Sequence, residues 1–281
     1  MRSSLRDARD ERGEVIAVDR LGGDMLELRV RLPHLAATAR PGQFAQVRCG
    51  DTTVPLLRRP FSVAWTDGDT ASFVVAPVGV GTRVLAALRP GEALAALGPL
   101  GRGFTIDPAP ERALCVCGGL GCAPFPLLVR ALRARGTEVT VVNGAATAAL
   151  LYPADRFRRG DDGVRVVQLT VDGSAGAQGL VTAAVPDAVS ASTAVYGCGP
   201  NPMLAALARA LDGCAAAPPL AEVSLEAPMG CGYGTCLGCA LPVVRHGGAT
   251  SWALCCRDGP VMQMADVAWH DLMALPAAHV A

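Results

Sequence analysis

The stretch MGCGYGTCLGCALPVVRHGGATSWALCCRDGPV, residues 229–261, decides how the whole chain is interpreted. It contains five cysteines: Cys231, Cys236, Cys239, Cys255 and Cys256. The first three follow the spacing C-x4-C-x2-C and the last two come after a short segment, which is typical of a plant-type [2Fe–2S] site. The glycines around them suit the same site, because a loop wrapped around a cluster requires unusual dihedrals and close backbone approach.

Two other interpretations of these cysteines are less favoured. Structural zinc also takes four thiolates, but its usual signature is two short, well-separated C-x2-4-C pairs, whereas three candidate ligands share one loop here. A disulfide framework fits poorly, because a chain of 281 residues is far longer than a small secreted scaffold and its eleven cysteines are an odd number. Spacing alone leaves open whether Cys255 or Cys256 is the fourth ligand.

Composition narrows the class of protein. With 51% hydrophobic residues over 281 positions, the chain can bury the cores of two or three domains. The formal net charge is zero and no run of like charges occurs, which argues against a nucleic-acid or membrane-surface partner. No apolar stretch reaches the roughly 18 residues of a membrane span, and residues 1–13 lack the apolar core of a signal peptide. We therefore expect a cytoplasmic protein, whose thiols stay reduced and available to a metal.

The spacing of apolar stretches and of glycine and proline residues predicts two domains before the cysteine segment. From residue 13 to about 107, short alternating stretches are interrupted every ten or so positions by glycine or proline, which predicts a small antiparallel β-barrel. From about residue 108 the pattern becomes strand, glycine turn and helix, which predicts a parallel sheet with helices on both faces. The expected domains are 1–107, 108–215 and the cysteine segment 216–281.

The barrel contains a candidate site for a flavin nucleotide. Residues 57–62, LRRPFS, place arginine in a strand that otherwise looks buried, and such a charge must find an anion or a carboxylate. An ion pair within the chain is one explanation. However, Gly79-Val80-Gly81-Thr82 follows as a glycine turn into a helix N-terminus, where backbone N–H groups and the helix dipole favour phosphate. Together the two stretches are suited to the pyrophosphate of a flavin nucleotide.

The second domain contains a candidate nucleotide site. The turn Gly118-Gly119-Leu120-Gly121 lies between a predicted strand and a predicted helix, although it departs from the strict G-x-G-x-x-G pattern and is weak alone. Gly197-Cys198-Gly199-Pro200 ends a later strand at what would be the same sheet edge, where open α/β sheets bind nucleotides. Cys198 is more readily explained as a small packed residue than as a catalytic one.

In this order, the motifs resemble those of the ferredoxin reductase-like flavoproteins. They are R-P-F-S at 59–62, G-x-G-T at 79–82, L-G-P-L-G-x-G-F at 97–104, G-G-x-G-x-x-P at 118–124, C-G-P at 198–200, and the cysteine segment. More narrowly, from residue 13 to about 264 the chain resembles the electron-transfer subunits of NAD-dependent class 1B dihydroorotate dehydrogenases. The resemblance implies a fold with an FAD-binding antiparallel barrel, a parallel-sheet NAD domain and a C-terminal [2Fe–2S] segment.

The resemblance also implies site residues. FAD contacts fall on Arg59, Pro60, Phe61, Ser62, Val74, Val75 and Ala76, with Gly81 and Thr82 at its phosphates. The remaining cofactor-binding positions are Gly118, Gly119, Gly121, Cys198, Gly199 and Pro200. The cluster ligands are Cys231, Cys236, Cys239 and Cys256. Cys256 is chosen because the family's last cysteine precedes x-x-Gly-Pro-Val, which matches residues 256–261 and leaves Cys255 a bystander. Val75 and Ala76 depart from the aromatic and basic residues common in the family, so backbone contacts are expected there.

The function implied by the resemblance is electron transfer in pyrimidine biosynthesis. A partner subunit oxidises dihydroorotate on FMN, electrons pass singly through the cluster to FAD, and FAD delivers hydride to the co-substrate NAD; the assembly is an α2β2 heterotetramer. FAD must lie between cluster and NAD, because a flavin carries one or two electrons whereas nicotinamide accepts a hydride. No general acid or base is assigned. Two alternatives are a related FAD/[2Fe–2S] NAD(P)H reductase subunit of a hydrogenase, sulfite reductase or transhydrogenase, and a non-catalytic zinc-binding relative.

Overall fold

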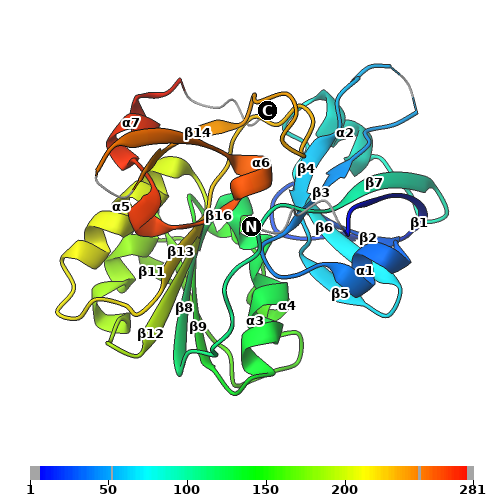
Figure 1. Ribbon diagram of the computed structural model, residues 1–281. Coiled ribbons are helices and arrows are strands. Elements are labelled where there is room, and N and C mark those ends of the chain that lie inside the picture. The colour runs from blue at the N-terminus through cyan, green and yellow to red at the C-terminus, as the bar shows by residue number, and fades with distance from the viewer. Residues whose placement is uncertain (1–6, 52, 246–247, 277–281) are drawn as a thin grey trace.

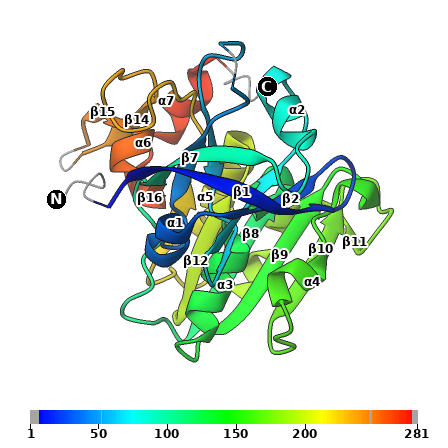
Figure 2. The same cartoon turned by 90° about the vertical axis from the view of Figure 1, so that its right-hand side faces the viewer.

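The computed structural model describes residues 7–51, 53–245 and 248–276, which form two large sheets and a smaller cysteine-containing segment (Figure 1). The N-terminal sheet and the sheet from the middle of the chain lie side by side, and the cysteine-containing segment lies across one end of both (Figures 1 and 2). None of the helices in these three ranges is long and apolar enough to span a membrane.

The first sheet has seven antiparallel strands in the order β4-β3-β7-β1-β2-β6-β5. They are β1 (Arg9–Arg20), β2 (Leu26–Arg31), β3 (Phe44–Val47), β4 (Arg59–Ser62), β5 (Trp65–Asp67), β6 (Thr70–Val75) and β7 (Ala93–Leu100), with helices α1 (Pro33–Thr38) and α2 (Val80–Ala86). Successive side chains of a strand point to opposite faces of the sheet. Leu28 and Val30 of β2 therefore point into the barrel core, with Phe73 and Val75 of β6. The predicted antiparallel barrel is confirmed.

The second sheet is parallel except at one edge, with the order β11-β10-β9-β8-β12-β13-β16. Its strands are β8 (Arg112–Gly118), β9 (Glu138–Ala145), β10 (Arg165–Thr170), β11 (Ala177–Gln178), β12 (Thr193–Cys198), β13 (Ala221–Ser224) and the antiparallel β16 (Val261–Gln263). Its helices are α3 (Phe125–Arg133), α4 (Ala154–Arg158) and α5 (Asn201–Asp212), with the short turns η1 (Gly119–Cys122), η2 (Ala148–Leu150), η3 (Val181–Ala184) and η4 (Pro186–Ala188). Helices α3 and α4 cover one face and α5 the other, as predicted (Figure 1).

The cysteine segment is anchored in the second sheet at both ends. It leaves from β13 and returns through β16, which pairs with β13. Between them lie the cysteine loop, the hairpin β14 (Ala240–Val244) and β15 (Thr250–Leu254), and helix α6 (Cys255–Asp258); η5 (Met264–Asp266) and α7 (Trp269–Ala274) follow. Buried residues of this segment belong to the same apolar core as β8, β12 and α5. The domain boundaries remain a prediction, with domains at 1–107, 108–215 and 216–281.

A buried carboxylate on the barrel holds the two sheets together. The side chain of Glu27 on β2 is fully buried and accepts hydrogen bonds from Arg156 Nη1 at 2.9 Å and Arg159 Nη2 at 2.6 Å, both at the end of α4. Arg156 also reaches Asp19 of β1 at 3.4 Å. A buried charge is tolerated only when it is paired and hydrogen-bonded, so Glu27 fixes where α4 lies against the barrel.

Removing the Glu27 carboxylate should therefore destabilise the protein strongly. We expect Glu27→Ala to lower the free energy of unfolding by about 3–5 kcal/mol, because two partly buried arginines lose their partner. The control is Glu14→Ala on the neighbouring strand, whose ion pair with Arg31 is half-exposed and should contribute less than about 1 kcal/mol. Urea unfolding followed by circular dichroism measures both; equal losses would contradict this role of Glu27.

Candidate functional site

A cleft of about 470 Å³ lies between the barrel and the second sheet. Eight of the residues predicted to bind cofactors line it: Arg59, Pro60, Phe61, Ser62, Val74, Ala76, Thr82 and Cys198. The other wall is formed by η1, by the end of β13 and by the linker from Leu225 to Met229. Motifs that are far apart in the sequence thus meet around one concave space.

In the predicted strand segment 74–76, successive side chains point alternately into the cleft and into the barrel core. Val74 and Ala76 line the cleft, whereas the side chain of Val75 between them is fully buried in the barrel core. A contact of Val75 with a cofactor would therefore come from its backbone, as the departure from the family pattern already led us to expect.

Arg58 and Arg59 have different surroundings. Arg58 forms a bidentate ion pair with Asp10 at 2.7 and 2.8 Å, and its hydrogen bonds hold the pKa of that carboxyl below its usual range. Arg59 contacts no carboxylate among the described residues; its Nη1 donates to the carbonyl oxygen of Leu57 at 2.8 Å. The ion-pair explanation therefore applies to Arg58, and Arg59 is left with a guanidinium in the cleft that suits an anion.

The turn at the start of α2 is built around Thr82. Its Oγ1 accepts the N–H of Gly79 at 2.8 Å and donates to the carbonyl oxygen of Gly79 at 3.1 Å. Thr82 also lines the cleft, so the turn faces it. Gly81 is buried against Cys49, whose Sγ would lie 3.1 Å from an added Cβ. Its small size therefore serves packing of α2 on the barrel.

The two glycine motifs of the second domain meet at adjacent strand ends. Strands β8 and β12 are parallel neighbours, so η1 lies beside the end of β12. A Cβ on Gly121 would lie 2.6 Å from the Cα of Gly199 and would collide with the carbonyl of Cys198. A Cβ on Gly118 would lie 2.7 Å from Sδ of the flexible Met203 side chain, which can move, whereas Gly119 has open space and a φ of +56°. The close backbone approach therefore requires glycine at Gly121.

The cleft also contains residues that sequence reasoning missed. Ser224 and Glu226 line it beside Cys198. Burial raises the pKa of Glu226, and burial together with the Glu226 charge raises the pKa of the Cys198 thiol. In the sequence Glu226 is an acidic residue two positions after a short apolar strand that itself contains Glu222, and this pattern does not by itself indicate a site.

The cysteine loop wraps its backbone around the sulfur of Cys231. Three N–H groups point to this Sγ, from Thr235 at 3.4 Å and from Tyr233 and Cys236 at 3.5 Å. Positive φ angles at Gly232, Gly234 and Leu237 allow this path. Burial opposes ionisation of Cys231, but the backbone N–H groups outweigh it and lower the pKa of the thiol to about 6. The loop thus favours the thiolate, which is the form that binds metal.

Helix α6 sends its two adjacent cysteines in opposite directions. The Sγ of Cys256 lies 3.2 Å from that of Cys239, and the backbone N–H of Cys256 donates to the same sulfur. Cys255 instead is fully buried, and its thiol donates to the carbonyl oxygen of Leu225 at 3.3 Å. The hydrogen bond from Cys256 lowers the pKa of Cys239 to about 6 and raises that of Cys256.

The four predicted ligands therefore come as two pairs. Cys231 and Cys236 interact through their side chains, as do Cys239 and Cys256. In the part of the chain that the structure describes, no three His, Cys, Asp or Glu side chains are placed to bind one metal ion. Two thiolate pairs suit a cluster with two irons, each bound by two cysteines.

Comparison with known proteins agrees with this geometry. Residues 226–268 match the family described as the iron-sulfur cluster binding domain of dihydroorotate dehydrogenase B, and residues 115–209 match an oxidoreductase NAD-binding domain. The dihydroorotate dehydrogenase B (NAD(+)) electron transfer subunit of Geobacillus thermodenitrificans is 36% identical over 92% of this chain and 98% of its own length. That of Desulforamulus reducens is 35% identical, over 91% and 97%. The chain belongs to this family of electron transfer subunits.

Solved structures place the family within a wider fold group. A structure of an NADH-dependent reduced ferredoxin-NADP oxidoreductase, described for flavin-based electron bifurcation, has a TM-score of 0.79 and 27% identity over 93% of this chain and 91% of its own. The ferredoxin reductase of carbazole 1,9a-dioxygenase has a TM-score of 0.65 and 25% identity over 74% and 67%. The resemblance inferred from the motifs is thereby confirmed, and the chain is an oxidoreductase subunit.

The different surroundings of Arg58 and Arg59 generate a prediction. Arg59→Ala should weaken FAD binding about tenfold or more, because one charge-assisted hydrogen bond contributes about 1.5–3 kcal/mol. Arg58→Ala removes the same charge from the adjacent position but breaks only contacts outside the cleft, the pair with Asp10 and a 3.4 Å hydrogen bond to the carbonyl oxygen of Gln46, so its FAD content should stay near wild type. Flavin released by denaturation and quantified by fluorescence tests both, and equal flavin content in the two variants would remove Arg59 from the site.

Proposed function

We propose that this chain passes electrons between a catalytic dihydroorotate dehydrogenase subunit containing FMN and NAD, through a [2Fe–2S] cluster and FAD. The proposal rests on one observation: the cleft and the cysteine loop are joined directly by the chain. The linker from Leu225 to Met229 lines the cleft, and Cys231 follows two residues later. A flavin in the cleft and a cluster in the loop would therefore be close neighbours.

The residues of the cleft have separate tasks in this proposal. Arg59 and the Thr82 turn bind the flavin phosphates, and Val74, Ala76 and the segment 60–62 form the wall against its ring. Gly118, Gly119 and Gly121 let the backbone approach a nicotinamide nucleotide, with Cys198, Gly199 and Pro200 at the neighbouring strand end. When bound, FAD supplies the exchange between one-electron and two-electron chemistry.

The cysteine loop binds the cluster in this proposal. The ligands are Cys231, Cys236, Cys239 and Cys256, and the backbone N–H groups around Cys231 stabilise negative charge on its sulfur. Hydrogen bonds to cluster sulfurs and solvent exposure set the reduction potential. Cys236 is exposed, so this side of the loop faces outward and gives electrons a way to leave the chain.

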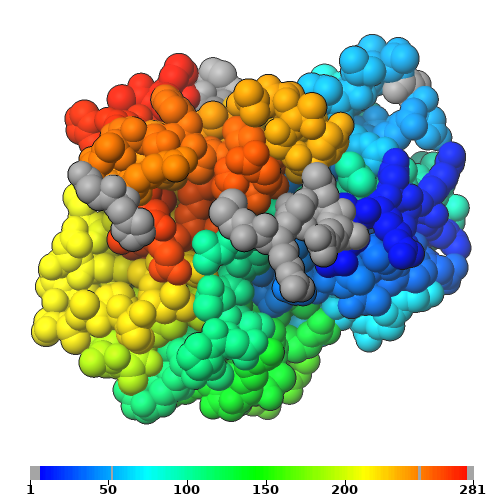
Figure 3. All heavy atoms as spheres, viewed as in Figure 1, coloured from blue at the N-terminus to red at the C-terminus, as the bar shows by residue number. Residues whose placement is uncertain are grey.

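The same surface suits the partner subunit. Leu237, 61% exposed, and Tyr233, 39% exposed, flank Cys236 on the loop. Leu57 of the barrel, 52% exposed, adds to the apolar side chains at the cleft. The loop lies at one end of the molecule beside the barrel loop that precedes β4 (Figure 3). Exposed apolar residues next to predicted ligands are typical of an interface, and an α2β2 heterotetramer in the cytoplasm is the proposed assembly.

A second candidate function has a specific observation in its favour. The similarity to the NADH-dependent reduced ferredoxin-NADP oxidoreductase covers 93% of this chain with a TM-score of 0.79. The chain would then serve as the FAD/[2Fe–2S] reductase subunit of another oxidoreductase. NADH formation driven by dihydroorotate in the co-purified pair distinguishes the two; a pair without this activity would favour the second function.

The adjacent cysteines of α6 test the ligand assignment. Cys256→Ser should abolish the iron–sulfur absorbance while FAD is retained, because one of the two thiolate pairs is broken. Cys255→Ser should retain both cofactors, since this thiol faces the core and Leu225. Visible spectra and iron content of the two variants show which cysteine binds the cluster. A cluster that survives Cys256→Ser would show that the fourth ligand is a different residue.

The partner surface leads to a further prediction. Leu237→Asp should weaken association with the catalytic subunit by at least about tenfold, because it places a charge in a predominantly apolar interface. Iron and flavin contents should not change, since Leu237 is exposed. Size-exclusion chromatography of the co-expressed pair measures this, with Leu180→Asp, which follows the edge strand β11 at the opposite end of the second sheet from β16, as a control of similar exposure. An intact complex with Leu237→Asp would move the interface elsewhere.

A further inference from the structure

The side chain of Gln46 is fully buried, yet neither polar atom of its amide has a hydrogen-bond partner among the described residues. Buried amides in native proteins are almost always hydrogen-bonded, and an exception calls for a specific explanation. A bound group beside the amide provides one. Gln46 belongs to no motif of the sequence, and nothing in the cleft geometry above assigns it a role.

Gln46 lies between the cleft and the cysteine loop. On β3, Ala45 and Val47 point into the barrel core, so Phe44 and Gln46 point the other way. Phe44 lines the cleft. Gln46 packs directly under the cysteine loop, where a Cβ on Gly232 would lie 2.6 Å from Gln46 Nε2. The amide therefore reaches the part of the loop next to Cys231.

We propose that Gln46 donates an amide N–H to a sulfur of the [2Fe–2S] cluster and so raises its reduction potential. The proposal rests on the proposed function, because it requires the cluster in this loop. An N–H donor stabilises the reduced cluster more than the oxidised one, since reduction adds negative charge to the sulfurs. Gln46 is thus a positioning residue for electron transfer, not a ligand.

The test uses the holoprotein and the variants Gln46→Met, similar in length but apolar, and Gln46→Glu, which removes the N–H donor. A redox titration followed by electron paramagnetic resonance should give a lower cluster potential and shifted g values in both. The control is Gln43→Met, immediately before β3, whose amide donates to the carbonyl oxygen of Gly101 at 2.9 Å; its cluster signal should match wild type.

The outcomes separate this inference from the proposed function. A cluster with unchanged potential and g values in both Gln46 variants would overturn the inference and leave the cluster assignment intact. A changed flavin potential with an unchanged cluster would also overturn it, because the amide would then belong to the flavin. A wild-type protein without any iron–sulfur signal would overturn the proposed function itself.

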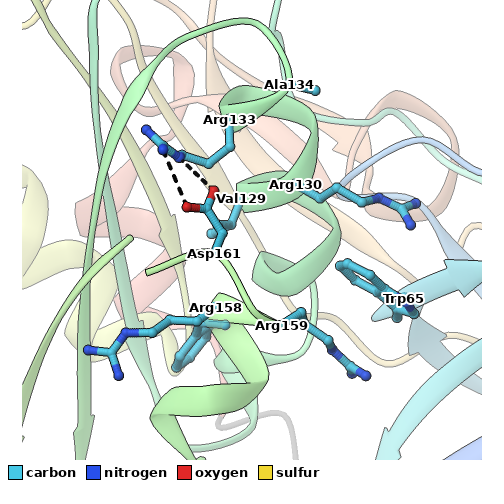
Figure 4. Close-up of a pocket in the computed structure, with 9 residues that line it drawn as sticks. Trp65, Val129, Arg130, Arg133, Ala134, Arg158, Arg159 and Asp161 are labelled. Atoms are coloured by element: carbon cyan, nitrogen blue, oxygen red, sulfur yellow. Dashed lines mark hydrogen bonds and ion pairs between the residues drawn. The ribbon is translucent and has the colours of Figure 1, made fainter. Parts of the chain in front are cut away.

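A second inference comes from a different part of the molecule. A pocket of about 380 Å³ lies between α3, α4 and the barrel strand β5, away from the cleft (Figure 4). Four arginines and one carboxylate line it, and its apolar floor includes Val129 and Phe157. Of the arginines, Arg133 pairs with Asp161 at 2.8 Å, at the opposite wall from Trp65 (Figure 4).

Two other guanidinium groups converge on Trp65. Arg130 lies 4.2 Å and Arg159 4.8 Å from the centre of its ring (Figure 4). Arg130 donates only to neutral oxygens of Thr66 among the described residues. Burial lowers its pKa, opposed by the nearby Asp67 carboxylate and reinforced by the Arg159 charge. Arg159 pairs with Glu27, but its Nε is buried and unpartnered there. Its φ of +46° is the left-handed conformation of the residue that caps the C-terminal end of α4.

The geometry points to a binding site for a phosphoryl group, held by Arg130 and Arg159. Arginine is the preferred residue for phosphate recognition, because its planar donors match the phosphate oxygens. The apolar floor suits the organic part of a small phosphorylated ligand such as a mononucleotide. The site joins the barrel to α3, whose N-terminal end follows the glycine turn of the cleft, so a bound ligand would stabilise the packing of the two domains.

Isothermal titration of the flavin-loaded protein at constant ionic strength tests this site, with inorganic phosphate, AMP and UMP as probes. We expect at least one probe to bind about tenfold more weakly to Arg130→Gln than to wild type. Arg135→Gln, which loses an exposed pair with Asp107 just beyond α3, is the charge-matched control and should bind like wild type.

A further variant leaves every existing contact in place. Ala134 is exposed at the pocket, so Ala134→Glu introduces a repelling carboxylate, whereas Ala134→Gln matches its size without the charge. Loss of binding in Ala134→Glu alone supports the site. For the binding that Ala134→Glu abolishes, tighter binding of AMP or UMP than of phosphate would identify a nucleotide ligand, and equal binding would identify free phosphate. No binding by wild type, or equal binding by Arg130→Gln and wild type, would overturn the inference.

Discussion

The site depends on how the barrel is held against the nucleotide-binding domain, and the carboxylate of Glu222 is central to that arrangement. It is fully buried and accepts hydrogen bonds from Arg102, Thr105 and Gln263 at 2.7–3.0 Å. Arg102 and Thr105 belong to the connection between the two domains, and Gln263 belongs to the strand that returns from the cysteine loop. Because a buried charge is stable only with such partners, one residue fixes the connection, the second sheet and the loop together.

The proposed electron path follows from this arrangement. The cleft takes one wall from each domain, and the linker from Leu225 to Met229 leads from it directly into the cysteine loop. Glu27 holds the domains together at α4, so the cleft is supported on more than one side. In the proposed function the chain acts by fixing distances and potentials, so a rigid frame matters for electron transfer.

The sequence is most informative about the candidate site where local geometry dictates one residue type. Gly121 must be glycine because the end of β12 leaves no room for a Cβ, and the motif around Cys256 distinguishes it from its neighbour although spacing alone does not. Roles set by distant parts of the chain could not be predicted. Glu226 and Gln46 are ordinary residues in sequence, and their significance depends on burial against segments that only the fold brings near.

The most direct test of the account is an anaerobic absorption spectrum of the purified protein before and after NADH addition, with iron, zinc and flavin quantified on the same sample. The account predicts FAD and about two irons per chain, with flavin and iron–sulfur absorbance both bleached by NADH. A protein that contains zinc and no flavin, or a cluster that NADH cannot reduce through FAD, would contradict it.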